Sequence, residues 1–483
     1  MALYNTRDLG QYVPNSGSPP IESRWVAVHN PILLEWQRKD YEFASVSESG
    51  GFLILNFGSA TGAAENDVLY VNCPGIYSGL ATITSLSGNN LITNVSIILP
   101  VGTYPGYANN TTQRLNYFIE VQIVTISASA TPSDNQILAT LLATPDTTGL
   151  IKIDISGSMQ SYTSNPDTIT LNTSANGEKD TGSTIPFKFR TREAWRQFAG
   201  LAYQPYESYS SASFGVNGAF QIGHDYNGNY AEYYPSSGPT GKFLTDFSRS
   251  RYFAGYPFDV SYIFPGDLVA VNTQIVTAFY NSAGAQIGGS AAGPLNVADI
   301  NYLNRIEPDT DISSWGQKVV SGSVQLQLSS GGVGLTEVHY FDVINPEDLD
   351  CNGIYLQWLG ALGNRSYWLF NAKYSESLQV DGGDTYQTAF DTIDNLTERA
   401  NWYEKKPFKK LTIGAEGLTR NQIDGLKSLL TSTKVDVLTA DGTGWKRTGV
   451  LVEPGTFTIG RGDDNQFRIE MSIVFPEQFN QTA

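Results

Sequence analysis

The chain has 483 residues, of which 30 are Lys or Arg and 47 are Asp or Glu, giving a formal net charge of −17. Only 16% of the residues are charged, so the sequence indicates a polar surface rich in Ser, Thr, Asn and Gly. This acidity argues against a nucleic-acid partner, which would need clustered Lys and Arg to displace counterions from phosphates. The chain is longer than a domain with a single hydrophobic core usually is, so we expect about two to four domains.

Aromatic and β-branched residues characterise the apolar part of the sequence. The 27 Tyr, 23 Phe and 8 Trp, with abundant Thr, Val, Ile and Gly, favour strands joined by tight turns. We predict a mainly β, multidomain fold of sandwich-like or barrel-like domains, ending in a β-rich module with two short helices. No apolar run reaches the roughly 18 residues of a membrane span. The first residues lack an apolar signal core, which predicts a protein kept in the cytosol or released without a cleavable signal.

The N-terminal segment differs from the rest of the chain. Residues 1–24 contain Pro14, Pro19 and Pro20 with little periodicity, which predicts an extended arm of the kind that often lies on a neighbouring subunit. From residue 25 the pattern becomes that of strands, and we predict one β domain over 25–126. Its strands are expected near 25–36, 51–57, 67–71, 79–84, 91–95 and 116–124, with a turn at 88–90.

The remaining residues divide into three further regions. Residues 127–242 are predicted as strands followed by a Tyr-rich loop region, 243–345 as another β domain, and 346–483 as the C-terminal module. The strands of the middle regions are expected near 150–155, 168–171, 185–190, 259–264, 272–280, 317–328 and 336–344. Those of the last module are expected near 409–413, 434–438, 449–453 and 467–475.

The C-terminal module carries the helix signals. A helix is expected over 419–430. Thr419 can cap its first turn, and its apolar residues share one face: Ile423, Leu426, Leu429 and Leu430. A second helix is expected within about 351–363. Three tryptophans are expected in the core of this module: Trp358, Trp368 and Trp445.

One turn resembles the start of a calcium loop. Asp348, Asp350 and Asn352 supply oxygen atoms at alternate positions before Gly353, as in the first half of an EF-hand. Leu359 stands where the bidentate acid of such a loop is required, so we favour a role for these acids in starting the predicted helix and keep calcium as the alternative. The three His have no nearby Cys or His at ligand spacing, and no cofactor is predicted.

No set of residues indicates a reaction. The pairs Asp381/Asp384 and Asp391/Asp394 could be compared with the two carboxylates of a glycosidase, yet such pairs arise by chance among 47 acids. There is no Gly-x-Ser-x-Gly elbow and no phosphate-binding Gly-x-x-x-x-Gly-Lys segment. We therefore predict that the protein is not an enzyme.

Two smaller motifs favour structural explanations. Cys73 and Cys351 lie far apart, which favours two buried thiols over a disulfide. Arg461 and Asp463 belong to an Arg-Gly-Asp tripeptide, for which a hairpin turn is the simpler interpretation than receptor binding.

The most unusual stretch is 203–234, where tyrosines alternate with Ser and Gly without helical or two-residue periodicity. This pattern predicts a long ordered loop or irregular ribbon. Its aromatic rings could stack on sugar rings or fill a subunit interface, where Tyr is enriched, and we favour the interface. The candidate residues are Tyr203, Tyr206, Tyr209, Tyr226, Tyr230 and Tyr233.

Several segments of the C-terminal module combine into a pattern found in one class of proteins. They are 354–363, 367–370, 410–413, 426–432, 435–437, 450–452 and 468–476, with Trp445, and more loosely 30–36 and 77–84 near the N-terminus. Together they resemble tail and baseplate structural proteins of tailed bacteriophages, especially those of phages infecting Bacteroidetes-type hosts, with distal-tail proteins as the nearest match.

This resemblance implies a virion protein that forms a homo-oligomeric ring or collar in the tail and contacts other tail proteins. Such a protein would be made in the cytoplasm of the bacterial host and carries no catalytic residues to transfer. The alternative is a receptor-binding tail fibre or adhesion module that uses the Tyr-rich segment on host surface glycans.

Overall fold

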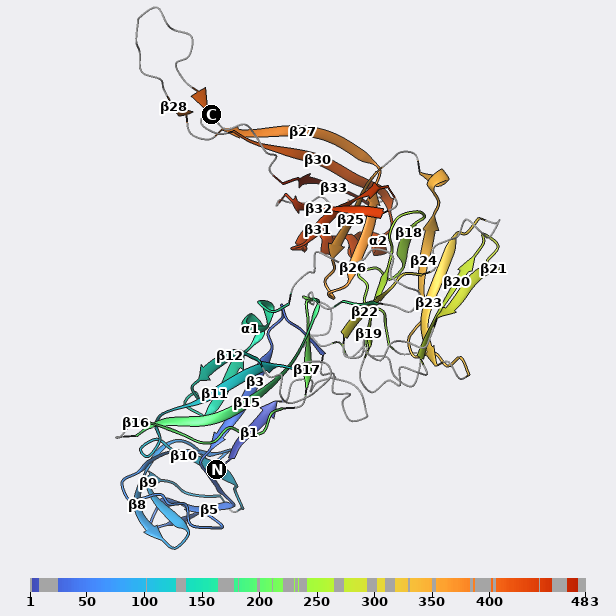
Figure 1. Ribbon diagram of the computed structural model, residues 1–483. Coiled ribbons are helices and arrows are strands. Elements are labelled where there is room, and N and C mark those ends of the chain that lie inside the picture. The colour runs from blue at the N-terminus through green and yellow to red at the C-terminus, as the bar shows by residue number, and fades with distance from the viewer. Residues whose placement is uncertain are drawn as a thin grey trace, which may run out of the picture. The chain divides into compact units, whose positions relative to one another are not determined.

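The structure of the protein is a computed structural model (Figure 1). It describes residues 2–7, 25–100, 102–126, 136–163, 178–180, 182–197, 200–210, 212–219, 230, 233, 241–264, 273–292, 302–308, 318–328, 331–349, 353–382, 385–386, 401–402, 405–442, 444–453 and 467–476. The chain forms two compact units. Unit 1 comprises 1–162, 185–215 and 225–231, and unit 2 comprises 163–184, 216–224 and 232–483. The fold is mainly β and multidomain, as predicted.

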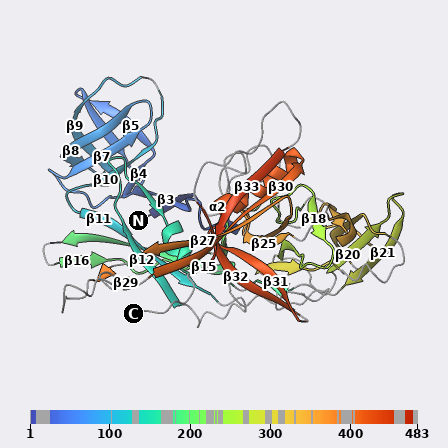
Figure 2. The same ribbon diagram turned by 90° about the horizontal axis from the view of Figure 1, so that it is seen from above.

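The first part of unit 1 is a curled antiparallel sheet, drawn in blue (Figure 2). Its two edge strands follow one another in the chain with only Ala44 between them, so the sheet is nearly closed into a barrel. Alternate residues point inward and form a separate core that includes Leu53, Leu69 and Ile83. In spatial order the strands are β4 (Tyr41–Phe43), β10 (Gly106–Asn110), β7 (Val68–Cys73), β8 (Tyr77–Ser87), β9 (Asn90–Ser96), β6 (Phe52–Asn56) and β5 (Ser45–Ser49).

The remainder of unit 1 contains two further sheets over a second core, which includes Trp36, Val121 and Phe187. One sheet has the order β1 (Ala2–Arg7), β3 (Leu33–Lys39) and β13 (Leu150–Asp154). The other has the order β12 (Gln136–Ala143), β11 (Leu115–Thr125), β15 (Thr184–Gln197), β17 (Ser213–Val216) and β2 (Trp25–Ala27), and β16 (Gly200–Tyr203) also pairs with β15. Helix α1 spans Ser156–Gln160.

The start of the predicted N-terminal arm is a strand of this chain's own sheet. Ala2–Arg7 pairs antiparallel with β3, and residues 8–24 lie outside the described part of the chain. The described residues 2–7 therefore belong to a sheet of their own chain, whereas the prediction was an arm outside the packed elements.

A buried ion-pair network connects the barrel to the second core of unit 1. The carboxylate of Asp40 lies 2.5 Å from Arg38 Nη2 and 3.0 Å from Arg114 Nη1, and its side chain is 2% exposed. Arg114 also pairs with Glu193 at 3.2 Å, and Asn110 N–H donates to Asp40 Oδ2 over 2.8 Å. A buried carboxylate and two arginines thus lie where the chain enters and leaves the barrel, and the arginines also pack on the rings of Tyr117 and Trp195.

In the described residues, unit 2 contains three larger sheets and a two-stranded one. The first has the order β14 (Glu178–Lys179), β22 (Tyr302–Ile306) and β19 (Val260–Phe264). The second has the order β18 (Ser250–Phe253), β24 (His339–Ile344), β23 (Ser321–Leu328), β20 (Thr273–Tyr280) and β21 (Gln286–Ala292). The third has the order β26 (Arg365–Phe370), β25 (Ile354–Leu359), β31 (Val435–Asp441), β32 (Gly444–Val452), β33 (Phe467–Val474), β30 (Lys405–Leu418) and β27 (Lys373–Gly382). Strands β28 (Thr385–Tyr386) and β29 (Asn401–Trp402) form the small pair.

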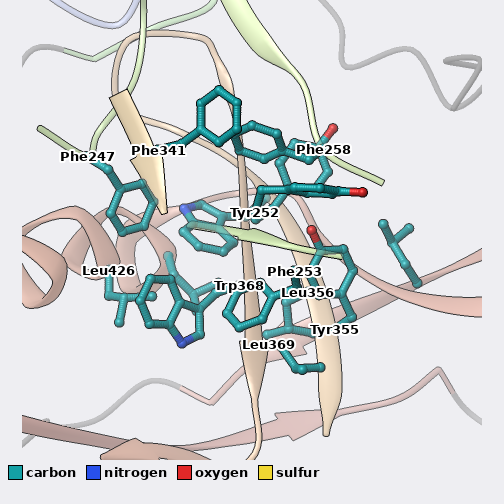
Figure 3. Packing of buried hydrophobic residues seen from close by; sticks show 14 of the residues in the cluster. Phe247, Tyr252, Phe253, Phe258, Phe341, Tyr355, Leu356, Trp368, Leu369 and Leu426 are labelled. Atoms are coloured by element: carbon teal, nitrogen blue, oxygen red, sulfur yellow. The ribbon is translucent and has the colours of Figure 1, made fainter. Parts of the chain in front are cut away.

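Unit 2 has one large aromatic core. Phe247 stacks on Trp368 with ring centroids 5.7 Å apart (Figure 3). Trp358 is fully buried and meets the same Phe247 ring edge to face. Trp445 is partly buried against this core, so all three predicted tryptophans pack there. Strands predicted in two separate regions, 243–345 and 346–483, contribute to this one core.

Helix α2 (Arg420–Thr431) covers part of the core as the sequence predicts. Thr419 is its N-cap, and the side chains of Thr419 and Gln422 each accept a hydrogen bond from the other's backbone N–H, which makes a complete capping box. Ile423, Leu426 and Leu429 are buried.

The prediction of a second helix within 351–363 is wrong. Ile354–Leu359 is strand β25, which forms a hairpin with β26, and a short 3₁₀ helix at Pro346–Asp348 precedes it. The cause is burial on both faces of β25, because a continuous apolar run cannot be assigned to a helix or a strand by periodicity. In the described residues, α2 is the one α-helix of the C-terminal module.

Candidate functional site

The described part of the Tyr-rich segment runs alongside strand β15. The N–H groups of Gln204, Glu207 and Ser210 donate to carbonyl oxygens of β15 over 2.8–2.9 Å. These acceptors belong to Glu193, Thr191 and Phe189. The segment therefore advances three residues for every two residues of β15. Over 204–210 it is an irregular ribbon, as predicted. Within the same predicted segment, however, Ser213–Val216 is the buried strand β17, so the expectation of irregular structure throughout 203–234 is wrong there.

Because of this three-to-two spacing, tyrosine rings of the segment contact arginine side chains of β15. Tyr203, Tyr206 and Tyr209 are three residues apart, while Arg190 and Arg192 are two apart on one face of β15. The Arg192 guanidinium lies 4.2 Å from the ring centroid of Tyr203 and 4.4 Å from that of Tyr206. The Arg190 guanidinium lies 4.2 Å from Tyr206 and 4.7 Å from Tyr209. We call these five residues the Arg–Tyr ladder.

Strand β11 supplies the polar partners beneath the ladder. Arg192 pairs with Glu120 at 2.8 Å, and the Tyr206 hydroxyl donates to the same carboxylate. Gln122 Oε1 accepts from Arg190 Nε over 2.8 Å. Each contact follows from register, because Glu120 lies directly opposite Arg192 and Gln122 opposite Arg190.

These contacts shift the pKa values of Glu120 and Tyr206 in opposite directions. Burial alone would raise the pKa of Glu120, but hydrogen bonds from Tyr206 and Arg192 lower it below its usual value. Burial and the hydrogen bond to Glu120 raise the pKa of Tyr206. At neutral pH Glu120 is therefore ionised and Tyr206 keeps its proton, and both are held in place by these hydrogen bonds.

The ladder is a preorganised surface rather than a reactive centre. Tyr203 is 45% exposed, Tyr206 and Tyr209 are half-buried, and the arginines are held by charge-assisted hydrogen bonds. Arg and Tyr are the residues enriched at the energetic centres of protein interfaces. Each of the three rings is contacted by at least one guanidinium group, so the rings and the arginines are held as one fixed surface.

The structure does not bring the other three candidate tyrosines to this surface. Tyr230 is completely buried in unit 1, so its ring is not available to a partner, contrary to the prediction. The sequence around Tyr230 has no helical or two-residue periodicity, so it gave no indication that this side chain is buried. Tyr233 is half-buried and belongs to unit 2, and Tyr226 lies outside the described residues.

Sequence reasoning missed the two arginines. Their signal was present in the alternation of Lys188, Arg190 and Arg192 along a strand, which places three cations on one face. What the sequence could not give was the register that places this face under Tyr203–Tyr209.

The proposed calcium turn is partly described. Asp348 ends the 3₁₀ helix and pairs with Lys318 at 2.6 Å, and hydrogen bonding to Lys318 lowers the pKa of this carboxyl. Asp350 and Asn352 lie outside the described residues. Among the residues that the structure does describe, no group of three or more His, Cys, Asp or Glu is arranged to hold a metal ion.

One pair of side chains has the composition of a nucleophile and its base. Ser250 Oγ lies 3.0 Å from His339 Nε2, and burial lowers the pKa of His339 to about 4, so the imidazole is neutral. Both residues are buried, and the cavity beside Ser250 has room for about one water molecule only. A substrate cannot reach this hydroxyl, so the pair contributes to packing.

The remaining sequence features are the two cysteines, the Arg-Gly-Asp tripeptide and the search for membrane-spanning helices. Cys73 is a buried free thiol in the barrel core, as predicted, while Cys351, Arg461 and Asp463 lie outside the described residues. No helix in the described part of the chain is long and apolar enough to cross a membrane.

No protein-family model, no curated protein and no solved structure matches this chain.

Proposed function

We propose that the protein is a structural component of a bacteriophage virion, a homo-oligomeric tail or baseplate protein that holds neighbouring tail proteins in register. The observation that carries this proposal is the Arg–Tyr ladder, a fixed surface with the composition of an interface centre. The resemblance of the C-terminal module to tail and baseplate proteins supports the same function. The proposed location is the virion tail, after synthesis in the bacterial host.

A second exposed surface in unit 2 supports an assembly role. Tyr374, Leu378 and Val380 lie on one face of the edge strand β27 and are 58%, 61% and 48% exposed. Figure 1 shows β27 and β30 as a long hairpin. Exposed apolar side chains on an edge strand are a common site of strand or surface pairing between chains. Two unlike surfaces on one subunit suit the head-to-tail contacts of a closed ring.

The experiment is the mass of the full chain in solution, measured by light scattering over a range of concentrations. We expect a closed oligomer for the native chain. Tyr203→Ala and Arg190→Ala should shift it toward the monomer, because each removes part of the ladder. Tyr162→Ala is the matched control, since Tyr162 has the same 45% exposure in unit 1 but lies outside the ladder.

A chain lacking residues 1–24 provides a separate comparison. It removes β1, whose described backbone partner is β3 of the same subunit, and so tests whether the arm also contributes to assembly. A native chain that stays monomeric at every concentration, alone and with other tail proteins, would contradict the proposal.

The alternative, a receptor-binding module, requires sugar binding by the Tyr-rich segment. Loss of glycan binding on Tyr206→Ala, with the oligomer unchanged, would favour this alternative. Loss of the oligomer with no glycan binding would favour the structural role.

A further inference from the structure

The barrel of unit 1 has an open groove where strands β4, β7 and β10 meet. Its volume is about 530 Å³, within the range of small-molecule sites, which is roughly 300–1,000 Å³. The side chains that line it include Lys39, Glu42, Phe43 and Tyr107.

The aromatic wall of the groove is held rigidly. The Tyr107 hydroxyl accepts a hydrogen bond from Asn72 Nδ2 over 2.7 Å and donates to the carbonyl oxygen of Thr148 over 3.0 Å. Asn72 Oδ1 in turn accepts from Ser78 Oγ over 2.9 Å. The Tyr107 ring therefore stays in one position without a ligand, so little side-chain entropy would be lost on binding.

A donor and an acceptor stand side by side at the edge of the groove. Lys39 Nζ lies 2.8 Å from Glu42 Oε1, and the two side chains are 26% and 49% exposed. Lys39 Nζ is 5.7 Å from the centroid of the Tyr107 ring, farther than the guanidinium groups of the Arg–Tyr ladder lie from their rings. The ring of Tyr107 is thus less closely covered than the rings of the ladder.

The floor is apolar and cannot easily collapse. Phe43 is buried, and a Cβ at Gly106 would run into the Phe43 ring and the Asn72 carbonyl. Only a glycine therefore permits this approach of β10 to β4. Pro74 and Pro105 are exposed and have little backbone freedom.

We propose that this groove binds one or two rings of a neutral saccharide. An aromatic ring complements the apolar face of a sugar. An adjacent ammonium and carboxylate can donate to and accept from neighbouring hydroxyl groups. The charges of Lys39 and Glu42 cancel, so a neutral sugar is expected rather than an acidic one. The site is separate from the Arg–Tyr ladder and does not depend on the proposed function.

The test is binding of neutral disaccharides to the full chain. Maltose, cellobiose, lactose and diacetylchitobiose would be titrated at millimolar concentrations, with calorimetry and ligand-observed NMR as readouts. We expect saturable binding of at least one sugar. Tyr107→Leu and Glu42→Gln should each weaken that binding about tenfold, through loss of the ring contact and of a charged acceptor.

Matched controls keep the outcome interpretable. Tyr162→Leu and Glu65→Gln make the same changes at exposed positions of unit 1 outside the groove and should leave the affinity unchanged. If circular dichroism shows that Tyr107→Leu unfolds the barrel, the sugar affinity of Glu42→Gln alone tests the proposal. The proposal is overturned by no saturable binding to the native chain or by binding that both groove variants retain.

Discussion

Unit 1 and unit 2 are both β-rich, but they are held together differently. Unit 2 has one continuous core in which aromatic rings from β18, β25 and β26 meet helix α2. Unit 1 has two separate cores, and the buried carboxylate of Asp40 is part of the described contact between them. A change in the core of unit 2 should therefore affect the whole unit, whereas a change at Asp40 should separate two parts that each remain folded.

The largest effect is expected for Trp358→Ala in unit 2. The side chain is fully buried, its Nε1–H donates to Ser428 Oγ over 2.9 Å, and its ring packs on Phe247. Truncation should lower the free energy of unfolding of unit 2 by roughly 3–5 kcal/mol. Calorimetry would measure this, with Leu451→Ala as control, since Leu451 is 73% exposed on the same sheet. A stability equal to that of the control would disprove the single-core description.

Asp40→Asn should have the next largest effect, confined to unit 1. The amide cannot balance the charges of Arg38 and Arg114, so the connection between the two cores should weaken by about 3 kcal/mol. Hydrogen exchange should then show the barrel opening more readily than the sheets around β11. Glu48→Gln is the control on an exposed position of the barrel. Equal protection of both parts in Asp40→Asn would mean that apolar contacts, not charges, join them.

A smaller effect is expected from mild acid on unit 2. Burial lowers the pKa of His339 to about 4 from the usual 6.5, so the unfolded chain takes up a proton at this residue before the folded chain does. Stability is therefore lost as pH falls below 6.5. Between pH 7 and pH 5 the loss should be about 2 kcal/mol. Urea unfolding at both values would measure it.

His339→Gln removes this contribution and can still hydrogen-bond to Ser250. The difference between the two chains isolates His339 from other titrating groups, including Asp246, whose pKa burial raises. Identical pH dependence of both chains would exclude His339 as the cause.

The sequence predicted most strands and helix α2, because alternation and the Thr419 cap are local signals. It failed at Ile354–Leu359, where both faces of the strand are buried. For the candidate site, the sequence identified Tyr203, Tyr206 and Tyr209 but not their partners. Their contacts with Arg190 and Arg192 depend on a register between two segments, and the burial of Tyr230 depends on tertiary packing.

The chain enters and leaves the barrel at adjacent residues, and this bears on whether the barrel can be lost or replaced in evolution. The segment leaves β3 at Asp40 and returns at Asn110, whose N–H binds the Asp40 carboxylate, while β3 continues to pair with β1 and β13. The barrel is therefore an insertion between β3 of one sheet and β11 of another, with entry and exit side by side. Relatives of this chain could lose it, or exchange it for another module, without shifting the register of any host strand.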